Sequence, residues 1–215
     1  MFATRISIRS RWIPRIASGL IALGLVSTAW SGPETPPSDA EGPRYAGDGR
    51  LVRPPDYREW AFVTSGLGMT YGPAKADDER SPRFDNVFVS RPAYREFLKS
   101  GTWPDRTMFI LEVRQAQSNV SINNGGRTQG EIVAIEAAVK DRTRYPEGGW
   151  AYFSFDGPEG PADSATPLPS SASCYKCHEE KTAVDNTFVQ FYPTLFDVAK
   201  RHGTVKPTYD PGRKP

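Results

Sequence analysis

The sequence predicts one α+β domain made mainly of antiparallel β-strands, with a few helices, two of them near its C-terminal end. Its 215 residues include 20 prolines and 19 glycines but only 3 methionines, which indicates many turns rather than a helical bundle. Short segments rich in aromatic and β-branched residues alternate with turn signals, as the strands of a meander do. Two of the three segments with helical spacing follow the last of these strands.

The predicted strands are short segments that combine aromatic with β-branched side chains. The first begins shortly after Tyr57, and Gly66 and Gly68 end it. An Asn/Gly loop at 123–126 separates the third strand from the fourth, and a turn at 146–149 precedes the fifth. This last connection is shorter than the roughly dozen residues of a parallel crossover, so antiparallel pairing is expected. The five strands are Trp60–Thr64, Val87–Val89, Met108–Val113, Ile132–Val139 and Trp150–Phe155.

The first predicted helix lies between the second and third strands. Ser90 is a candidate N-cap, Pro92 falls in the first turn, and Gly101 marks the end. Tyr94, Phe97 and Leu98 follow the spacing of one apolar helix face. After a loop at 156–171 that is rich in Pro, Gly and Ser, two further helices are predicted at about 174–180 and 196–202.

The first thirty or so residues have the features of an export signal. Four arginines and no acidic residue precede an apolar run of about fifteen residues, Ile16–Trp30, with small residues at Ser27 and Ala29. This run is shorter than the roughly twenty apolar residues of a membrane span. We therefore expect residues 1–31 to be a signal peptide, the mature protein to be periplasmic, and no membrane span to remain after cleavage.

The composition of the remaining chain suggests three regions. Residues 32–55 are rich in Pro, Gly and acidic side chains and are expected to form a flexible leader. Residues 56–200 are expected to fold as the domain, and residues 201–215 to form a tail. Because the signal peptide carries four arginines, its removal lowers the formal charge from +2 to −2. This balance argues against a nucleic-acid partner, which requires clustered Lys and Arg.

The strongest chemical signal is the motif Cys174-Tyr175-Lys176-Cys177-His178. C-x-x-C-H is the attachment pattern of a c-type haem. Two thiols three positions apart lie on one helical turn, where each can form a thioether with a haem vinyl group. The adjacent His178 can then bind the iron from the same side. The sequence thus predicts one covalent haem c with its iron on His178, and predicted export agrees with extracytoplasmic haem attachment.

Three other interpretations of the motif remain open. A thioredoxin-like pair would lie at the start of a helix within a βαβ unit, which does not surround Cys174. A structural zinc ion takes four ligands, and only His202 is left to complete Cys174, Cys177 and His178. A disulfide between Cys174 and Cys177 would close a very small loop and stabilise little.

The second axial position of the iron decides between classes of cytochrome. Electron-transfer cytochromes use Met or His there, and the candidates are Met69, Met108 and His202. Met108 opens a strand and is expected in the core, His202 lies near a solvated tail, and Met69 lies in a glycine turn. The motif is also near the C-terminus, unlike that of small electron carriers. Five-coordinate iron with an open position is therefore expected.

The chain resembles the cytochrome P-460 family, which includes the beta-sheet cytochromes c′. The resemblance extends over about residues 54–198, and its last block is the most specific because it extends the haem motif to FVQFYPTL. The blocks are YREW (57–60), LGMTYGP (67–73), FDNVFVSRPAY (84–94), GTWPDRT (101–107), EAAVKD (136–141), GGWAYFSF (148–155) and CYKCHEEKTAVDNTFVQFYPTL (174–195).

The resemblance implies a haem held against an antiparallel sheet by a C-terminal helical segment, an open coordination position, and a homodimer. In members that oxidise hydroxylamine, a lysine of a sheet strand is bonded to the haem edge. Leu111 occupies that position here, so the cofactor contact at Leu111 is expected without a cross-link. Lys99 and Lys140 are the nearest lysines in the aligned region. Glu136 matches a glutamate that is assigned to proton transfer in those enzymes, and it is the candidate catalytic residue.

The functional expectation is a mono-haem cytochrome that binds small nitrogen oxides, chiefly nitric oxide. An apolar, water-poor pocket favours neutral diatomic ligands over anions. The first alternative is an oxidoreductase that oxidises hydroxylamine, with Glu136 as base and a redox partner protein as electron acceptor. The second is a simple electron carrier, which needs a sixth ligand. Four aromatic residues are expected to serve packing more than to cap the haem: Trp60, Phe84, Phe88 and Trp150.

Overall fold

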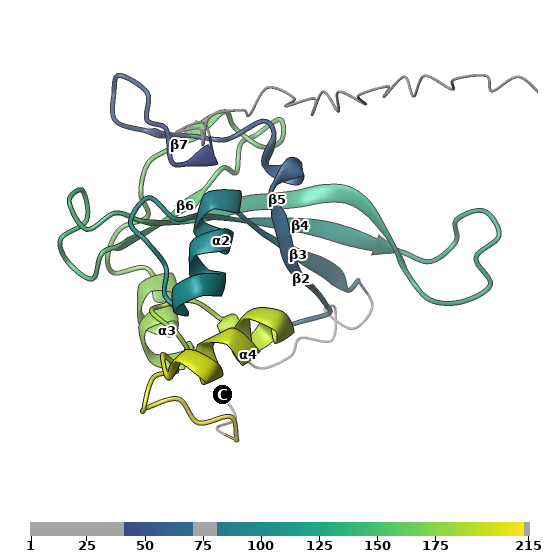
Figure 1. The fold of residues 1–215 in the computed structure, drawn as a ribbon. Coiled ribbons are helices and arrows are strands. Elements are labelled where there is room, and N and C mark those ends of the chain that lie inside the picture. The colour runs from purple at the N-terminus through teal and green to yellow at the C-terminus, as the bar shows by residue number, and fades with distance from the viewer. Residues whose placement is uncertain (1–40, 71–80, 213–215) are drawn as a thin grey trace, which may run out of the picture. The chain divides into compact units, whose positions relative to one another are not determined.

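The computed structural model describes residues 41–70 and 81–212. Five strands form one antiparallel sheet in the order β2-β3-β4-β5-β6, a meander in which each strand pairs with the next in sequence (Figure 1). The α+β class predicted from the sequence is thereby confirmed. The elements are β1 (Leu51–Val52), η2 (Tyr57–Glu59), β2 (Ala61–Leu67), β3 (Arg83–Val89), α2 (Arg91–Ser100), β4 (Met108–Gln117), β5 (Thr128–Lys140), β6 (Trp150–Ser154), β7 (Ser164–Ala165), α3 (Ser173–Lys181), η3 (Val189–Phe191) and α4 (Pro193–His202).

Each of the five predicted strands is present, and most are longer than predicted. β4 and β5 continue past the apolar residues as a hairpin with polar ends. The sequence predicts strands only as far as the apolar pattern extends. In the structure, backbone hydrogen bonding between two neighbouring strands continues into their polar ends. β4 and β5 pair in this way from Met108↔Val139 to Gln117↔Thr128.

The helices α2, α3 and α4 lie on one face of the sheet (Figure 1). Because side chains alternate between the two faces of a strand, Val89, Phe109 and Tyr152 all project to this face. They pack with Phe97 of α2 and Leu195 of α4 in one apolar core. Helix, sheet and the loops after α3 therefore enclose a common space, in which the candidate site lies.

A second apolar core covers the opposite face of the sheet. Met108, Ile110 and Ile135 project into it from β4 and β5. Leu51 of β1, fully buried, closes it, and β1 pairs with β7 in a separate two-stranded sheet. Trp60 also belongs to this core, whereas Trp150 belongs to the helix-side core.

Two predicted boundaries differ from the described structure. The sequence predicts a flexible leader at 32–55, but residues 41–55 pack against the domain through Leu51 and the β1–β7 pair. A two-residue strand has too little sequence to stand out among prolines and glycines. The predicted tail also contains packed residues, since Val205 and Tyr209 contact the helix-side core. The predicted signal peptide, residues 1–31, lies outside the described residues.

Of the two residues predicted to delimit α2, Gly101 ends the helix as expected, whereas Ser90 does not cap it through its side chain. Ser90 occupies the N-cap position, but its side chain makes no capping hydrogen bond. Gly101 ends the helix with a φ of 70°, and its N–H donates to the Phe97 carbonyl at 2.8 Å. A Cβ at Gly101 would lie 2.8 Å from the Cβ of His202, so the glycine also permits close packing on the end of α4.

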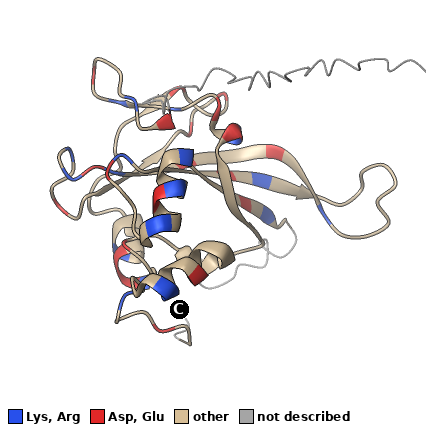
Figure 2. Ribbon diagram, viewed as in Figure 1, with Lys and Arg blue, Asp and Glu red and all other residues tan. Residues whose placement is uncertain are grey.

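Most charged side chains lie on the surface of the described fold. Lys and Arg recur along α2, whose exposed residues include Arg91, Arg95 and Lys99 (Figure 2). Glu112 on β4 and Lys140 on β5 are buried, and each is neutralised: Glu112 by contacts with Arg58 and Arg114, Lys140 by Asp185. None of the helices in the described ranges has the length and apolar character needed to cross a bilayer.

Candidate functional site

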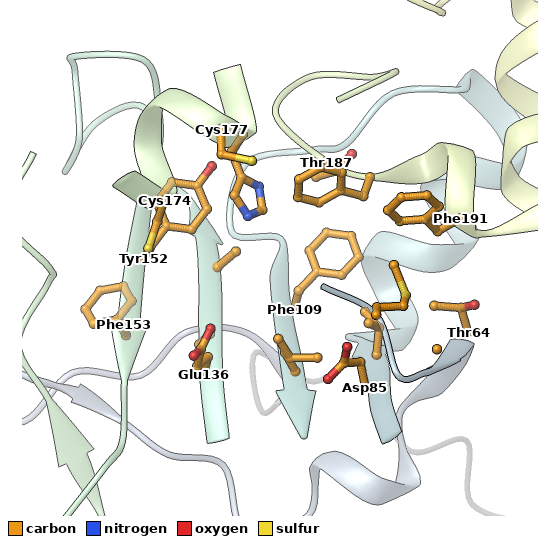
Figure 3. Close-up of a pocket in the computed structure, with 18 of the residues that line it drawn as sticks. Thr64, Asp85, Phe109, Glu136, Tyr152, Phe153, Cys174, Cys177, Thr187 and Phe191 are labelled. Atoms are coloured by element: carbon orange, nitrogen blue, oxygen red, sulfur yellow. The ribbon is translucent and has the colours of Figure 1, made fainter. Parts of the chain in front are cut away.

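A cavity of about 340 Å³ lies between α3 and the helix-side face of the sheet. This volume falls within the range of roughly 300–1,000 Å³ that is usual for small-molecule and cofactor sites. Its walls combine the motif residues Cys174, Cys177 and His178 with side chains from β2 to β6. In Figure 3, Cys174 and Cys177 lie on one side of this space, and Glu136 and Asp85 lie on the other.

The sheet wall of the cavity is a consequence of strand register. Thr64, Val87, Leu111 and Glu136 are successive cross-strand partners on β2, β3, β4 and β5. They form one row on one face of the sheet, and all four line the cavity. Leu111 is at the centre of this row, directly opposite Glu136. A one-residue slip of β4 would turn Leu111 to the other face and place the buried Glu112 in the cavity.

Helix α3 carries the motif. Cys174 and Cys177 lie one helical turn apart, both thiols are free, and both residues are half-buried. Burial raises the pKa of the Cys174 thiol, and the charge of Glu136 raises it further. The Cys174 thiol is thus held mainly in its neutral form at the edge of an apolar space. The geometry suits addition of each sulfur to a group within the cavity.

His178 is oriented by the backbone of the loop that follows α3. Its Nδ1 lies 2.8 Å from the carbonyl oxygen of Asn186. Because a carbonyl oxygen only accepts, Nδ1 carries the proton and Nε2 is left with its lone pair. The rings of Tyr152 and Phe188 flank the imidazole, with centroids 4.4 and 4.6 Å away. This is the arrangement of a neutral histidine that is ready to bind a metal through Nε2.

The environment keeps His178 neutral. Burial lowers the pKa of its imidazole, the hydrogen bond to Asn186 raises it, and the nearby Lys206 ammonium lowers it. A neutral imidazole is the form that binds a metal.

The residues present fit a haem in this cavity. Two thiols and one available imidazole nitrogen face a wall of apolar side chains that includes Phe109 and Leu111. The hydroxyl of Tyr152 is buried at the same wall and has no hydrogen-bond partner among the described residues. An orphaned buried hydroxyl is costly and indicates a missing polar partner. The haem would be held by Cys174, Cys177 and His178.

The alternative zinc interpretation lacks its fourth ligand in the described structure. His202 is exposed at the end of α4 and does not line the cavity. No group of three or more His, Cys, Asp or Glu within residues 41–70 and 81–212 is arranged to hold a metal ion. A haem, in contrast, needs a single axial imidazole from the protein.

Two carboxyl groups face the cavity from the sheet. The Glu136 side chain remains accessible to solvent at the cavity. The protein atoms around it nevertheless remove part of its hydration, which raises the pKa of its carboxyl, and the charges of Asp156 and Asp85 raise this pKa further. Asp85 lies on β3, one row away from Leu111. Burial raises the pKa of Asp85 to about 6, although the Arg83 guanidinium lowers it in part. The cavity therefore carries one carboxyl, that of Asp85, which exchanges its proton near pH 6, and a second, that of Glu136, whose pKa is also raised.

The three candidate second ligands of the iron are placed differently. Met69 lines the cavity, whereas Met108 is fully buried in the core on the opposite face of the sheet. His202 is held away from the cavity at the end of α4. Met69 folds back over Gly66, where an added Cβ would lie only 2.2 Å from the methionine sulfur. Of the three, the structure keeps Met69 as the residue to test.

The lysines considered from the sequence lie elsewhere. Lys99 is exposed at the end of α2. Lys140 is buried, and its ammonium donates to the Trp103 carbonyl at 2.8 Å and pairs with Asp185. No lysine in the described part of the chain lines the cavity. Leu111 lines the cavity at the position where the resemblance implies a cross-linking lysine in hydroxylamine-oxidising members.

Sequence reasoning missed several residues of the site. Asp85 and Tyr152 could have been found from alternation, because each lies two positions from an apolar residue of the same face, Val87 and Trp150. Asn186 contributes only a backbone carbonyl, for which a sequence has no signal. Lys206 lies in the predicted tail, and only the folded chain brings it near the motif.

Comparison with known families adds one finding. The model of the family described as Cytochrome P460 matches residues 54–189, well over half of the chain. This segment extends from just before η2 to the start of η3 and includes the whole sheet and α3. No curated protein matches the chain.

Proposed function

The chain belongs to the cytochrome P460 family of haem-binding cytochromes, and we propose that it is a periplasmic mono-haem c-type cytochrome that binds nitric oxide. The observation that carries this proposal is the composition of one cavity. His178 with a free Nε2, the thiols of Cys174 and Cys177, and an apolar sheet wall centred on Leu111 all face the same space.

Each motif residue has a separate role in this proposal. Cys174 and Cys177 would hold the cofactor through two thioethers, and His178 would bind its iron through Nε2. The haem would supply an iron that can bind a small ligand. Asn186 fixes the imidazole plane through its carbonyl, while Tyr152 and Phe188 prevent rotation of the ring.

The cavity selects the ligand by its polarity. Apolar side chains such as Val87, Leu111 and Phe191 dominate its lining, so a strongly hydrated anion would lose more hydration than it regains. A neutral diatomic molecule loses little. Above pH 6, ionised Asp85 also repels anions such as nitrite. Both effects favour nitric oxide.

Oxidation of hydroxylamine is the second candidate. It is favoured by Glu136 and Asp85, two cavity carboxyls of raised pKa that can accept and donate protons, with the pKa of Asp85 at about 6. Leu111 has no nucleophilic atom and cannot form the haem bond expected of hydroxylamine-oxidising members. We therefore rank this activity second, and it would require a redox partner protein as electron acceptor.

The proposal also includes assembly and location. Residues 1–31 direct export, and haem attachment takes place outside the cytoplasm. A homodimer is proposed from the family resemblance alone.

The decisive experiment is spectroscopic. The purified ferrous protein is expected to have a high-spin spectrum, to bind nitric oxide stoichiometrically, and to turn over hydroxylamine slowly or not at all. His178→Ala should retain covalent haem but lose the native ligation, while Cys174→Ser with Cys177→Ser should lose covalent haem. A haem-free protein that contains stoichiometric zinc after expression with the haem-maturation system would contradict the proposal. Steady hydroxylamine turnover would promote the second candidate.

A further inference from the structure

The loop that follows α3 holds the carbonyl that orients His178, and its backbone is unusual. Asp185 and Asn186 have φ values of 40° and 56°. Positive φ is uncommon for a residue other than glycine, and two in succession require support from the surrounding structure. The carbonyl of Asn186 accepts the Nδ1–H of His178 from this conformation. The interactions that stabilise the loop therefore also determine the position of the imidazole.

The first anchor of this loop comes from the sheet. Asp185 pairs with the buried ammonium of Lys140 and accepts a hydrogen bond from the Trp150 indole at 3.2 Å. The Trp103 indole donates to the Thr187 hydroxyl at 2.8 Å, and that hydroxyl donates to the Val184 carbonyl at 2.6 Å. These contacts hold the side of the loop that faces the core.

The second anchor is Lys206, which lies beyond the last helix. Its ammonium donates to the Glu179 carbonyl at 2.9 Å, to the Thr182 hydroxyl at 2.8 Å and to the Asn186 side-chain oxygen at 3.5 Å. Thr182 in turn donates to the carbonyl of His178 itself. The backbone N–H of Lys206 also donates to the Ala183 carbonyl at 2.8 Å.

One ammonium thus joins both sides of the histidine. Through Thr182 it is linked to the helix end that carries His178. It also contacts the side chain of Asn186, the residue whose carbonyl accepts the hydrogen bond from the imidazole Nδ1–H. Lys206 is half-buried, where charge-assisted hydrogen bonds are stronger than at the surface. Its three acceptors match the three donors of an ammonium.

We propose that Lys206 is a positioning residue for His178: by bridging Thr182 and Asn186, it keeps the Asn186 carbonyl in place for the imidazole. This inference rests on the proposed function, because it takes His178 to be the iron ligand. A weaker Nδ1–H bond makes the imidazole a poorer donor to iron. The C-terminal segment would thereby influence how strongly His178 binds the iron.

The test compares four variants of the full-length holoprotein. Lys206→Met removes the ammonium and keeps the length of the side chain, and Lys206→Arg retains a charged donor. Lys99→Met is the matched control at an exposed lysine far from the cavity. His178→Ala identifies the iron–histidine stretching band in the resonance Raman spectrum of the ferrous protein. Hydrogen exchange of peptides covering residues 182–190 is measured in parallel.

For Lys206→Met we expect the iron–histidine band to broaden and move to lower frequency, and exchange over 182–190 to become roughly tenfold faster. Lys206→Arg should recover most of both effects, and Lys99→Met should behave as the wild type. An unchanged band in Lys206→Met would overturn the inference, even if the variant melts earlier, because a merely structural role lowers stability alone.

Failure of the proposed function has a different signature. If the wild type has no band that His178→Ala removes, the histidine is not the iron ligand and the proposed function itself fails. If Lys206→Met does not fold, Thr182→Val breaks the same bridge and keeps the side-chain shape. It should shift the band in the same direction by a smaller amount, and an unshifted band there also overturns the inference.

Discussion

Leu111 and the two carboxyls near it determine the chemistry of the sheet wall at the scale of single residues. Leu111 faces Glu136 across β4 and β5, and Asp85 lies on β3, one row further along the sheet. An apolar side chain therefore lies between two groups that gain a negative charge as pH rises. Leucine has no nucleophilic atom, so no cross-link can form at this position, while the two carboxyls can still accept and donate protons.

The raised pKa of Asp85 predicts a pH-dependent stability. The carboxyl titrates near 3.8 in the unfolded chain and at about 6 in the folded one, so its ionised form destabilises the fold. This penalty is absent below pH 3.8 and grows as pH rises through 6. We expect Asp85→Asn to increase the free energy of unfolding by about 1–2 kcal/mol near pH 8, after allowance for solvent screening, and by much less near pH 4.

Urea unfolding of the holoprotein at both pH values measures this difference. The matched control is Glu131→Gln, which removes an exposed carboxyl from β5 and should change stability little at either pH. Equal stabilisation by Asp85→Asn at both pH values would show that the effect does not come from ionisation.

Met69 offers the sharpest test of coordination number. If the iron has His178 as its only protein ligand, Met69→Leu should leave the absorption spectrum nearly unchanged, because the thioether is then only part of the cavity wall. Met108→Leu is the control, since Met108 lies in the opposite core. A change from a low-spin to a high-spin spectrum in Met69→Leu alone would instead establish six-coordinate iron. The electron-carrier interpretation would then gain support.

At the scale of elements, α2 and α4 meet where each of them ends. Gly101 adopts a φ of 70°, and an added Cβ would lie 2.8 Å from the Cβ of His202 and 2.9 Å from the Thr204 hydroxyl. The Thr204 hydroxyl donates to the Gly101 carbonyl at 2.7 Å. The end of α2 is thereby joined to the chain that leaves α4 and leads to Lys206.

Gly101→Ala is predicted to destabilise the protein through this junction. The left-handed conformation and the close contact together should cost on the order of 1–3 kcal/mol. Thermal unfolding checks this, with Gly125→Ala as the control, because a Cβ at Gly125 would meet nothing within 4 Å. A melting temperature equal to that of the control would mean that α4 moves away to make room.

At the scale of the whole molecule, export and haem attachment predict a definite mass. The intact mass of protein purified from the periplasm of an expression host with the haem-maturation system should match a chain that begins near residue 30 and carries one haem. A protease digest should give a single haem-bearing peptide that contains Cys174–His178. A second peptide attached to the same haem would reveal a cross-link despite Leu111 and would favour hydroxylamine oxidation. A mass that includes residues 1–31 would indicate an uncleaved anchor.

The sequence by itself determined the fold class, the positions of the five main strands and the C-x-x-C-H motif. These depend on short-range signals: period-two alternation in strands, glycine turns, and two thiols on one helical turn. Alternation also predicts that Asp85 and Val87 share a face. The family match over residues 54–189 agrees with this part of the prediction.

Only the tertiary structure decided what surrounds the motif. Strand register places Asp85, Leu111 and Glu136 on one wall, and register depends on pairing between residues up to dozens of positions apart. The support of His178 comes from a backbone carbonyl at Asn186 and an ammonium at Lys206, which follows in the predicted tail. Local sequence preferences contain no information on such contacts, because their free energy is gained only when the distant segments have packed.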